Sequence, residues 1–447
     1  AASVAARAIL REVRVLVGEN FTDQFEYAAM ARSLASEGGF LVLGRPSTLY
    51  PPLYPAFLAP FAHPGGGIGS LVLAGSVASA SGLVPLWLLG RRLLDGRRLR
   101  FALSIAAILP SSLLLPAEVF SEALFYPLAW WWALAGIRFL ERPGVGRAAV
   151  WGALLGGLVL IRVAGLALVG AVPLAAILEA LIHADPGARR GAAARAILLS
   201  SAALLVAGLV ALPWTLRNLA LHEAAVPLYA EADVGRIVRA GDANYALEFV
   251  RQLAHLAAGS GLLFFALALP LLTARTPTGT VARLAAIAIV FATAASAYHH
   301  YLGREAGIGR MIFGRYVAYT YPLLVLAGMS ALDRPRWWAF AATAVLVGTT
   351  FPFPVFRDLE TRFLLPAYWL VDSAWAVRAA LAACAAGFGW LLATRRRRLA
   401  LAAISGWLLV ADLHAIAYLH AIGQGVEPLR RFSVRIARES GGRPVVF

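Results

Sequence analysis

Asp23 and Glu26 are two carboxylates three residues apart in the stretch FTDQFEYAAMARSL, residues 21–34. Apolar residues recur along this stretch at helical spacing, which predicts a helix. Carboxylates at i and i+3 share a helix face, and a positioned carboxylate can remove a proton from a hydroxyl group. The competing interpretation is that Thr22 or Asp23 only caps the start of the helix, a position that suits both residue types.

Glu118 and Glu122 form a second acidic pair, at i and i+4. Like charges at this spacing repel each other on a helix, so the pair favours a cation or an arginine between the two carboxylates. The alternative is a solvated turn with no further role. A further alternative is that oxygen ligands from Asp23 and Glu122 bind a divalent cation. Whether the protein has a metal site is therefore left open.

Three arginines are candidates to bind an anionic group. Arg162 lies in an apolar run, where a charge is costly and indicates function by default; the alternative is that it snorkels to the membrane surface. Arg217 follows Trp214 closely, and Arg315 precedes Tyr316. Each of these two arginines could instead be an anchor at the membrane interface.

Tyr50 and Tyr54 belong to the block YPPLYP at residues 50–55. Three prolines in five residues restrict the backbone to a stiff path, first extended and then turned. The block therefore predicts a rigid segment after the first helix.

The composition indicates how these residues are positioned. Apolar residues make up 60% of the 447 and charged residues 14%, and the mean hydropathy is +0.73. Soluble domains carry about 25% charged residues, so lipid must be the solvent of this chain. The formal charge of +16 comes from 40 arginines, with no lysine, set in short clusters between apolar runs. That pattern excludes nucleic-acid binding, which needs a basic face on a soluble domain.

Apolar runs long enough to cross a bilayer as helices predict an all-α, polytopic transmembrane bundle. Twelve ranges qualify: 68–90, 101–116, 119–140, 148–162, 163–182, 196–216, 258–274, 284–299, 316–332, 337–353, 378–394 and 399–420. The predicted organisation is a first extracytoplasmic segment with surface helices (1–67), the bundle (68–420) and a short extracytoplasmic tail (421–447).

Alternate connections between these runs are rich in arginine, beginning with 91–100 and ending with 395–398. The positive-inside rule places those connections in the cytoplasm. Residues 20–67, a long loop at about 217–257 and most carboxylates then lie outside. The arginine-only, alanine-rich composition suggests a GC-rich prokaryote, hence the inner (plasma) membrane of a bacterium. Residues 1–19 are too charged to span, so either an earlier helix is missing or they lie along the surface.

Several short motifs on the predicted extracytoplasmic side resemble, in their order along the chain, those of the GT-C superfamily of membrane glycosyltransferases. Within it, the protein O-mannosyltransferases and the lipid A aminoarabinose transferases are the most similar. The motifs are Asp23–Tyr27, Tyr50–Pro55, Ser121-Glu122, PWTLRN at 213–218, and Arg315-Tyr316 followed by Pro322. The resemblance spans residues 21–322 and implies about thirteen spanning helices, one more than the ranges above.

The resemblance also implies a polyprenyl-phosphate-linked sugar as donor, with no cofactor required. It assigns Asp23 as general base and Glu122, or Glu118, as a second acid of the site. Arg315 or Arg217 would be the phosphate partner. The remaining candidates for substrate binding are Glu26, Tyr27, Tyr50, Tyr54, Arg162 and Tyr316.

The resulting hypothesis is an inverting glycosyltransferase that uses an extracytoplasmic acceptor, a glycan, lipid or protein hydroxyl. A lipid phosphosugar already carries its leaving group, and a single carboxylate base favours inversion. Two alternatives remain: a secondary transporter, which would favour midplane charges and internal repeats that the sequence does not show, and a polyprenyl-linked polysaccharide polymerase or ligase.

Overall fold

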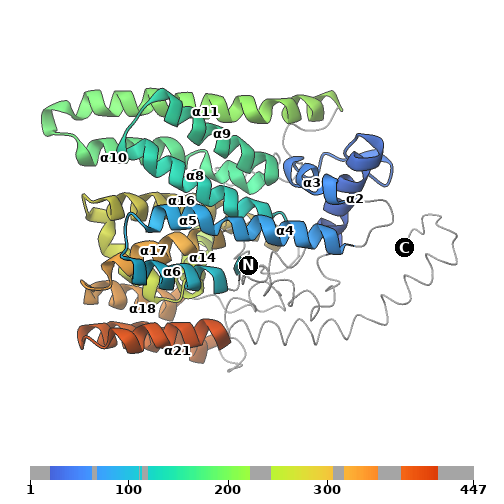
Figure 1. Cartoon of the computed structure of the whole chain (residues 1–447). Helices are drawn as coiled ribbons and strands as arrows, with labels where there is room; N and C mark the ends of the chain where they lie inside the picture. The colour runs from blue at the N-terminus through green and yellow to red at the C-terminus, as the bar shows by residue number, and fades with distance from the viewer. Residues whose placement is uncertain are drawn as a thin grey trace, which may run out of the picture.

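The computed structural model describes residues 21–62, 68–109, 111–112, 119–221, 243–305, 317–350 and 374–410, and these form an α-helical bundle with a small attached segment (Figure 1). The attached segment comprises α2 (Phe21–Glu37), β1 (Leu41–Val42), β2 (Arg45–Pro46), α3 (Leu53–Leu58) and the 3₁₀ turn η2 (Ala59–Phe61). The bundle comprises α4 (Gly69–Ser81), α5 (Leu83–Gly90), α6 (Gly96–Ile108), α8 (Glu122–Glu141), α9 (Val145–Ile161), α10 (Ala171–His183), α11 (Arg189–Ala220), α14 (Ala243–Gly259), α15 (Leu263–Ala268), α16 (Pro277–Glu305), α17 (Tyr321–Ala331), α18 (Trp337–Thr350) and α21 (Ala374–Ala393).

The bundle is that of a multi-pass membrane protein, as predicted. Five helices are long and apolar enough to cross a bilayer, and a bent helix pair raises the number to six within the described residues. Shorter apolar helices, such as Val145–Ile161 and Trp337–Thr350, lie among them. Every range predicted as a span overlaps a helix of the structure.

The region predicted as a loop at about 217–257 is partly wrong. Residues 243–259 form α14, which the 104° bend joins to the helix ending at Thr273. Gly261 and Leu262 have φ angles of +80° and +57°, which break the helix there. Sequence hydropathy missed α14 because its buried face carries Glu248 and other polar side chains.

Arginine-rich connections gather at one end of the bundle, the left end in Figure 1. Arg92 pairs with Glu141 at 2.7 Å, and Arg98 pairs with Asp333 at 2.6 Å. Arg397 also pairs with Asp333. These bridges join connections that are distant in sequence, so the arginine-rich connections around residues 92–98 and 397 lie at the same end of the bundle, together with the carboxylates of Glu141 and Asp333.

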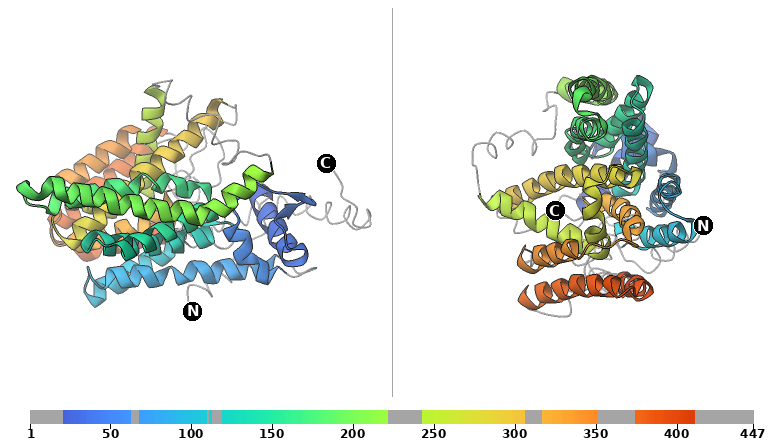
Figure 2. Two further views of the ribbon diagram at one scale, coloured as in Figure 1. Left: turned by 90° about the horizontal axis from the view of Figure 1, so that it is seen from above. Right: turned by 90° about the vertical axis from the view of Figure 1, so that its left-hand side faces the viewer.

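The tightest helix pair is α9 with α11. Gly152 and Gly156, four residues apart on α9, face Ala203 and Ala207 on α11. Small residues at this spacing let two helix backbones approach closely, which is a usual way to associate helices in membranes. The contact fixes α11 along the bundle, so its far end reaches the attached segment (Figure 2).

Candidate functional site

Three tyrosines of the attached segment form a cluster at the end of the bundle opposite the arginines. Tyr27 of α2 lies 4.7 Å from Tyr50 and 5.0 Å from Tyr54, measured between ring centroids. Tyr27 and Tyr54 are buried. The prolines of the YPPLYP block set the path that brings Tyr50 and Tyr54 back against α2.

Asp23 joins this cluster through the hydroxyl of Tyr50, which donates a hydrogen bond of 2.5 Å to Asp23 Oδ1. Burial and then this bond to Asp23 raise the pKa of Tyr50, so the phenol keeps its proton. Asp23 lies in the first turn of α2, not before it. The interpretation that Asp23 only caps the helix is therefore wrong, and its side chain is held by a tyrosine 27 residues away.

Glu26 lies one helical turn after Asp23. Burial, followed by the negative charge of Asp23, raises the pKa of the Glu26 carboxyl. The two carboxylates thus interact electrostatically, as their predicted shared helix face requires.

Glu122 and Arg162 form a buried ion pair beside the cluster. Arg162 Nη1 donates to Glu122 Oε1, and the side chains are 12% and 1% exposed, respectively. Arg162 has φ −157° and ψ +136°, an extended conformation between α9 and the 3₁₀ turn η4 (Val163–Leu168). This break aims the guanidinium at the start of α8, so the interpretation of Arg162 as a snorkelling arginine is wrong.

Tyr27 connects the two parts of the site. Burial raises the pKa of Tyr27, whereas the Arg162 charge and a hydrogen bond with Ser121 oppose that rise. Ser121 also lies 3.5 Å from Arg162 Nη1. One continuous set of polar side chains therefore runs from Asp23 through the tyrosines to Ser121, Glu122 and Arg162.

Solved structures of similar fold share this arrangement of helices. ArnT from Cupriavidus metallidurans, in its crystal structure bound to undecaprenyl phosphate, superposes with a TM-score of 0.55 at 16% identity, covering 95% of this chain and 76% of that one. Its apo crystal structure gives 0.54 at 16% identity, covering 94% and 76%. The chain has the same fold as ArnT.

A third structure, arabinosyltransferase EmbB from Mycobacterium smegmatis, matches with a TM-score of 0.45 at 17% identity, covering 96% of this chain and 40% of that one. Neither a protein-family model nor a curated protein sequence matches the chain. The two ArnT structures confirm the predicted resemblance at the level of the fold.

Arg217 makes a separate set of contacts, with Trp214 and with the attached segment. Its guanidinium lies 4.4 Å from the ring centroid of Trp214, and Nη1 donates to the carbonyl of Ser47 at 3.1 Å. Phe40 packs edge-on against Trp214 at 5.4 Å. These contacts fasten the attached segment to the end of α11.

Three predicted site residues, Glu118, Arg315 and Tyr316, lie outside the described residues. No group of three or more His, Cys, Asp and Glu side chains that could hold a metal ion occurs within the described part of the chain. Sequence reasoning did not predict Ser121 as a site residue. It also did not predict that Phe40 and Ser47 are partners of Arg217. Only the adjacency of Ser121 to Glu122 gave a signal for the first, and nothing local gave one for the others.

Proposed function

We propose that this protein is an inverting glycosyltransferase that moves a sugar from a polyprenyl-phosphate-linked donor to a hydroxyl of an extracytoplasmic acceptor. The observation that carries the proposal is the continuous polar site from Asp23 to Arg162 at the end of the bundle away from the arginine-rich connections. A donor whose hydrocarbon tail stays in lipid would present its phosphosugar at that end.

In the proposed reaction, Asp23 takes the proton of the acceptor hydroxyl as its oxygen bonds to the anomeric carbon. The bond from that carbon to the phosphate oxygen breaks, and polyprenyl phosphate leaves with the electron pair. Attack from the side opposite the phosphate inverts the anomeric centre. Arg315 offsets the charge of the departing phosphate with its planar fork, while Arg162 holds Glu122 in place.

Support for a polyprenyl-phosphate partner comes from the solved ArnT structure that contains undecaprenyl phosphate. By the positive-inside rule, the arginine-rich end of the bundle would face the cytoplasm. The candidate site, at the opposite end, would then lie on the extracytoplasmic side of the inner membrane. The acceptor class remains a glycan, lipid or protein hydroxyl.

The test is incubation of purified protein with a radiolabelled polyprenyl-phosphate sugar, scoring transfer or release of the sugar. Asp23→Asn should abolish turnover, and Glu37→Gln, an exposed carboxylate at the other end of α2, should leave it unchanged. Normal turnover in Asp23→Asn would overturn the base assignment. Solute flux in proteoliposomes that proceeds without any lipid-linked sugar would support a transporter instead.

A further inference from the structure

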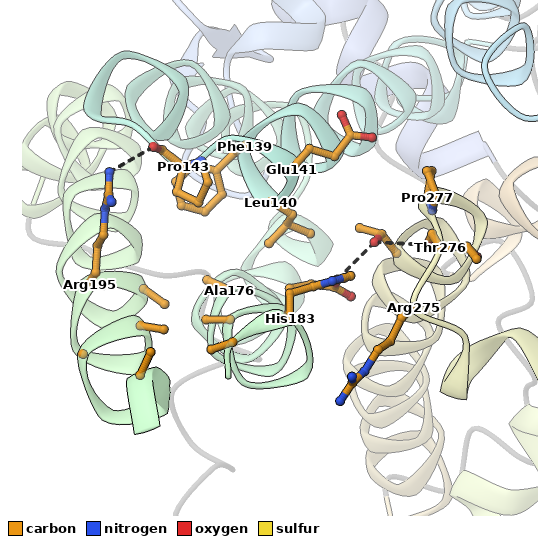
Figure 3. A pocket seen from close by; sticks show the side chains of 18 of the residues that line it. Phe139, Leu140, Glu141, Pro143, Ala176, His183, Arg195, Arg275, Thr276 and Pro277 are labelled. Carbon is orange, nitrogen blue, oxygen red and sulfur yellow. Dashed lines mark hydrogen bonds and ion pairs between the residues drawn. The ribbon is translucent and has the colours of Figure 1, made fainter. Parts of the chain in front are cut away.

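A pocket of about 900 Å³ opens at the arginine-rich end of the bundle, far from the candidate site (Figure 3). It lies between the C-terminal ends of α8 and α10 and the N-terminal ends of α11 and α16. Because α8 runs from Glu122 in the candidate site to Glu141 in the pocket wall, its 20 residues separate the two by roughly 30 Å.

Both carboxylates of the pocket already have cationic partners. Glu179, 5% exposed, receives hydrogen bonds from Arg283, itself 3% exposed, and from Thr280 at 3.0 Å. Arg283 also donates to the carbonyl of Ala274 at 2.6 Å, which locks it in place. Glu141 pairs with Arg92 at 2.7 Å.

The pocket therefore has surplus positive charge. Arg195 of α11 makes a hydrogen bond of 3.5 Å to the carbonyl of Pro143, and Arg275 lies in the connection before α16. Neither arginine has a carboxylate partner within the described ranges. His183 stands between them, with Nε2 3.3 Å from Glu179 and a side chain 48% exposed (Figure 3).

Apolar side chains form the rest of the wall. Phe139, Leu140, Ala176 and Ala180 line the side toward the bundle. A free soluble anion would gain nothing from such a wall, whereas an amphiphile could place its head on the arginines and its chain along the apolar residues. Basic pockets between transmembrane helices on the cytoplasmic side are typical sites for anionic lipid headgroups.

We propose that this pocket binds the phosphodiester headgroup of an anionic phospholipid of the surrounding membrane through Arg195 and Arg275. Thr276 lies at the same rim, and its hydroxyl offers a further donor to the phosphate. One acyl chain lies against Ala176 and Ala180. The proposal does not depend on the transfer reaction assigned to the opposite end.

The test uses the full chain in a neutral detergent and native mass spectrometry with phosphatidylglycerol or phosphatidylcholine of the same acyl chains. We expect selective retention of phosphatidylglycerol, together with a rise in melting temperature. The double variant Arg195→Gln/Arg275→Gln should lose about 10- to 30-fold in apparent affinity, because each arginine near anionic lipid contributes about a factor of five.

The matched control is Arg334→Gln/Arg336→Gln, which removes the same charge from exposed arginines in the connection between α17 and α18. An equal loss in the control would mean that only the general charge of this end matters, and would overturn the proposal. Equal retention of inorganic phosphate, or preferential retention of a polyprenyl phosphate, would overturn it as well.

A second variant guards against misfolding of the arginine double variant. Ala180→Leu keeps every charge and fills the apolar wall, so it should reduce phosphatidylglycerol retention while the rim stays intact. Unchanged retention in a folded Ala180→Leu protein would contradict the assigned position of the acyl chain.

Discussion

Arg162 donates a hydrogen bond to Glu122 from a position 40 residues away, and both side chains are withdrawn from solvent. A helix break supplies the arginine and the first turn of α8 supplies the carboxylate. Taking two charges out of water is costly, and their attraction offsets that cost only where both are present. The pair therefore ties the start of α8 to the end of α9 within the candidate site.

This pairing predicts strong coupling between the two residues. Glu122→Gln and Arg162→Met should each lower the free energy of unfolding by about 3–5 kcal/mol, because each removes one member of a buried ion pair. The double variant should lose much less than the sum. Urea unfolding of the four proteins in detergent gives the coupling energy directly. Additive losses would show that the two charges do not depend on each other.

Tyr50 is predicted to position Asp23 for proton transfer. Tyr50→Phe removes the hydroxyl that donates to Asp23 Oδ1, and hydrogen bonds to charged groups contribute about 1.5–3 kcal/mol. We expect kcat to fall about 10- to 100-fold with KM nearly unchanged.

The matched control for this change is Tyr54→Phe. Tyr54 belongs to the same aromatic cluster, but its hydroxyl has no hydrogen-bond partner in the described part of the chain. Its removal breaks no bond to Asp23, so kcat should fall much less than in Tyr50→Phe. Equal losses of kcat in both variants would show that the cluster matters only as packing.

The helices and their common arginine-rich end could be predicted from the sequence because lipid enforces both. A spanning helix needs a long apolar run, and arginine clusters mark one side. The exception is α14, whose Glu248 and Arg251 pair within the helix at 2.5 Å and so carry their charges into the bundle. A hydropathy scale scores each charged residue separately, so it does not take into account that two charges neutralise each other within a helix.

The candidate site could be predicted only in part. The shared face of Asp23 and Glu26 follows from helix geometry. The partners of Asp23, Glu122 and Arg162 depend on tertiary packing between segments 27 to 40 residues apart, and local spacing carries no information about that. An arginine was expected near Glu122, but the sequence could not say which one.

Glu26 should make stability depend on pH. Its carboxyl pKa is raised in the folded protein, so ionisation at neutral pH opposes folding. Glu26→Gln should therefore raise the melting temperature at pH 7. The gain should shrink as the pH falls toward and below the ordinary value of 4.5, where the carboxyl is protonated in both states. Melting curves from pH 4 to 8 test this. Glu37→Gln, on the exposed end of α2, should show no such trend.

Arg217 is predicted to hold the attached segment rather than to bind phosphate. Arg217→Gln removes the stacking on Trp214 and the bond to Ser47. Limited proteolysis should then cut within residues 38–49 several times faster, and transfer activity should fall. Arg190→Gln, exposed at the opposite end of the same helix, is the control. A loss of donor affinity with unchanged proteolysis would return Arg217 to the phosphate site.

Gly152 should be the least replaceable glycine of α9. A Cβ at this position would overlap the backbone carbonyl of Ala203 on α11, which cannot move independently. Gly152→Ala should force α9 and α11 apart and cost about 1–3 kcal/mol, as overpacking does. Gly146, on the same helix, has open space around its Cβ position, so Gly146→Ala should instead stabilise by about 0.5–1 kcal/mol through helix propensity. Unfolding of the two variants side by side measures the difference. A Gly152→Ala protein as stable as the Gly146→Ala protein would contradict the close approach of α9 and α11.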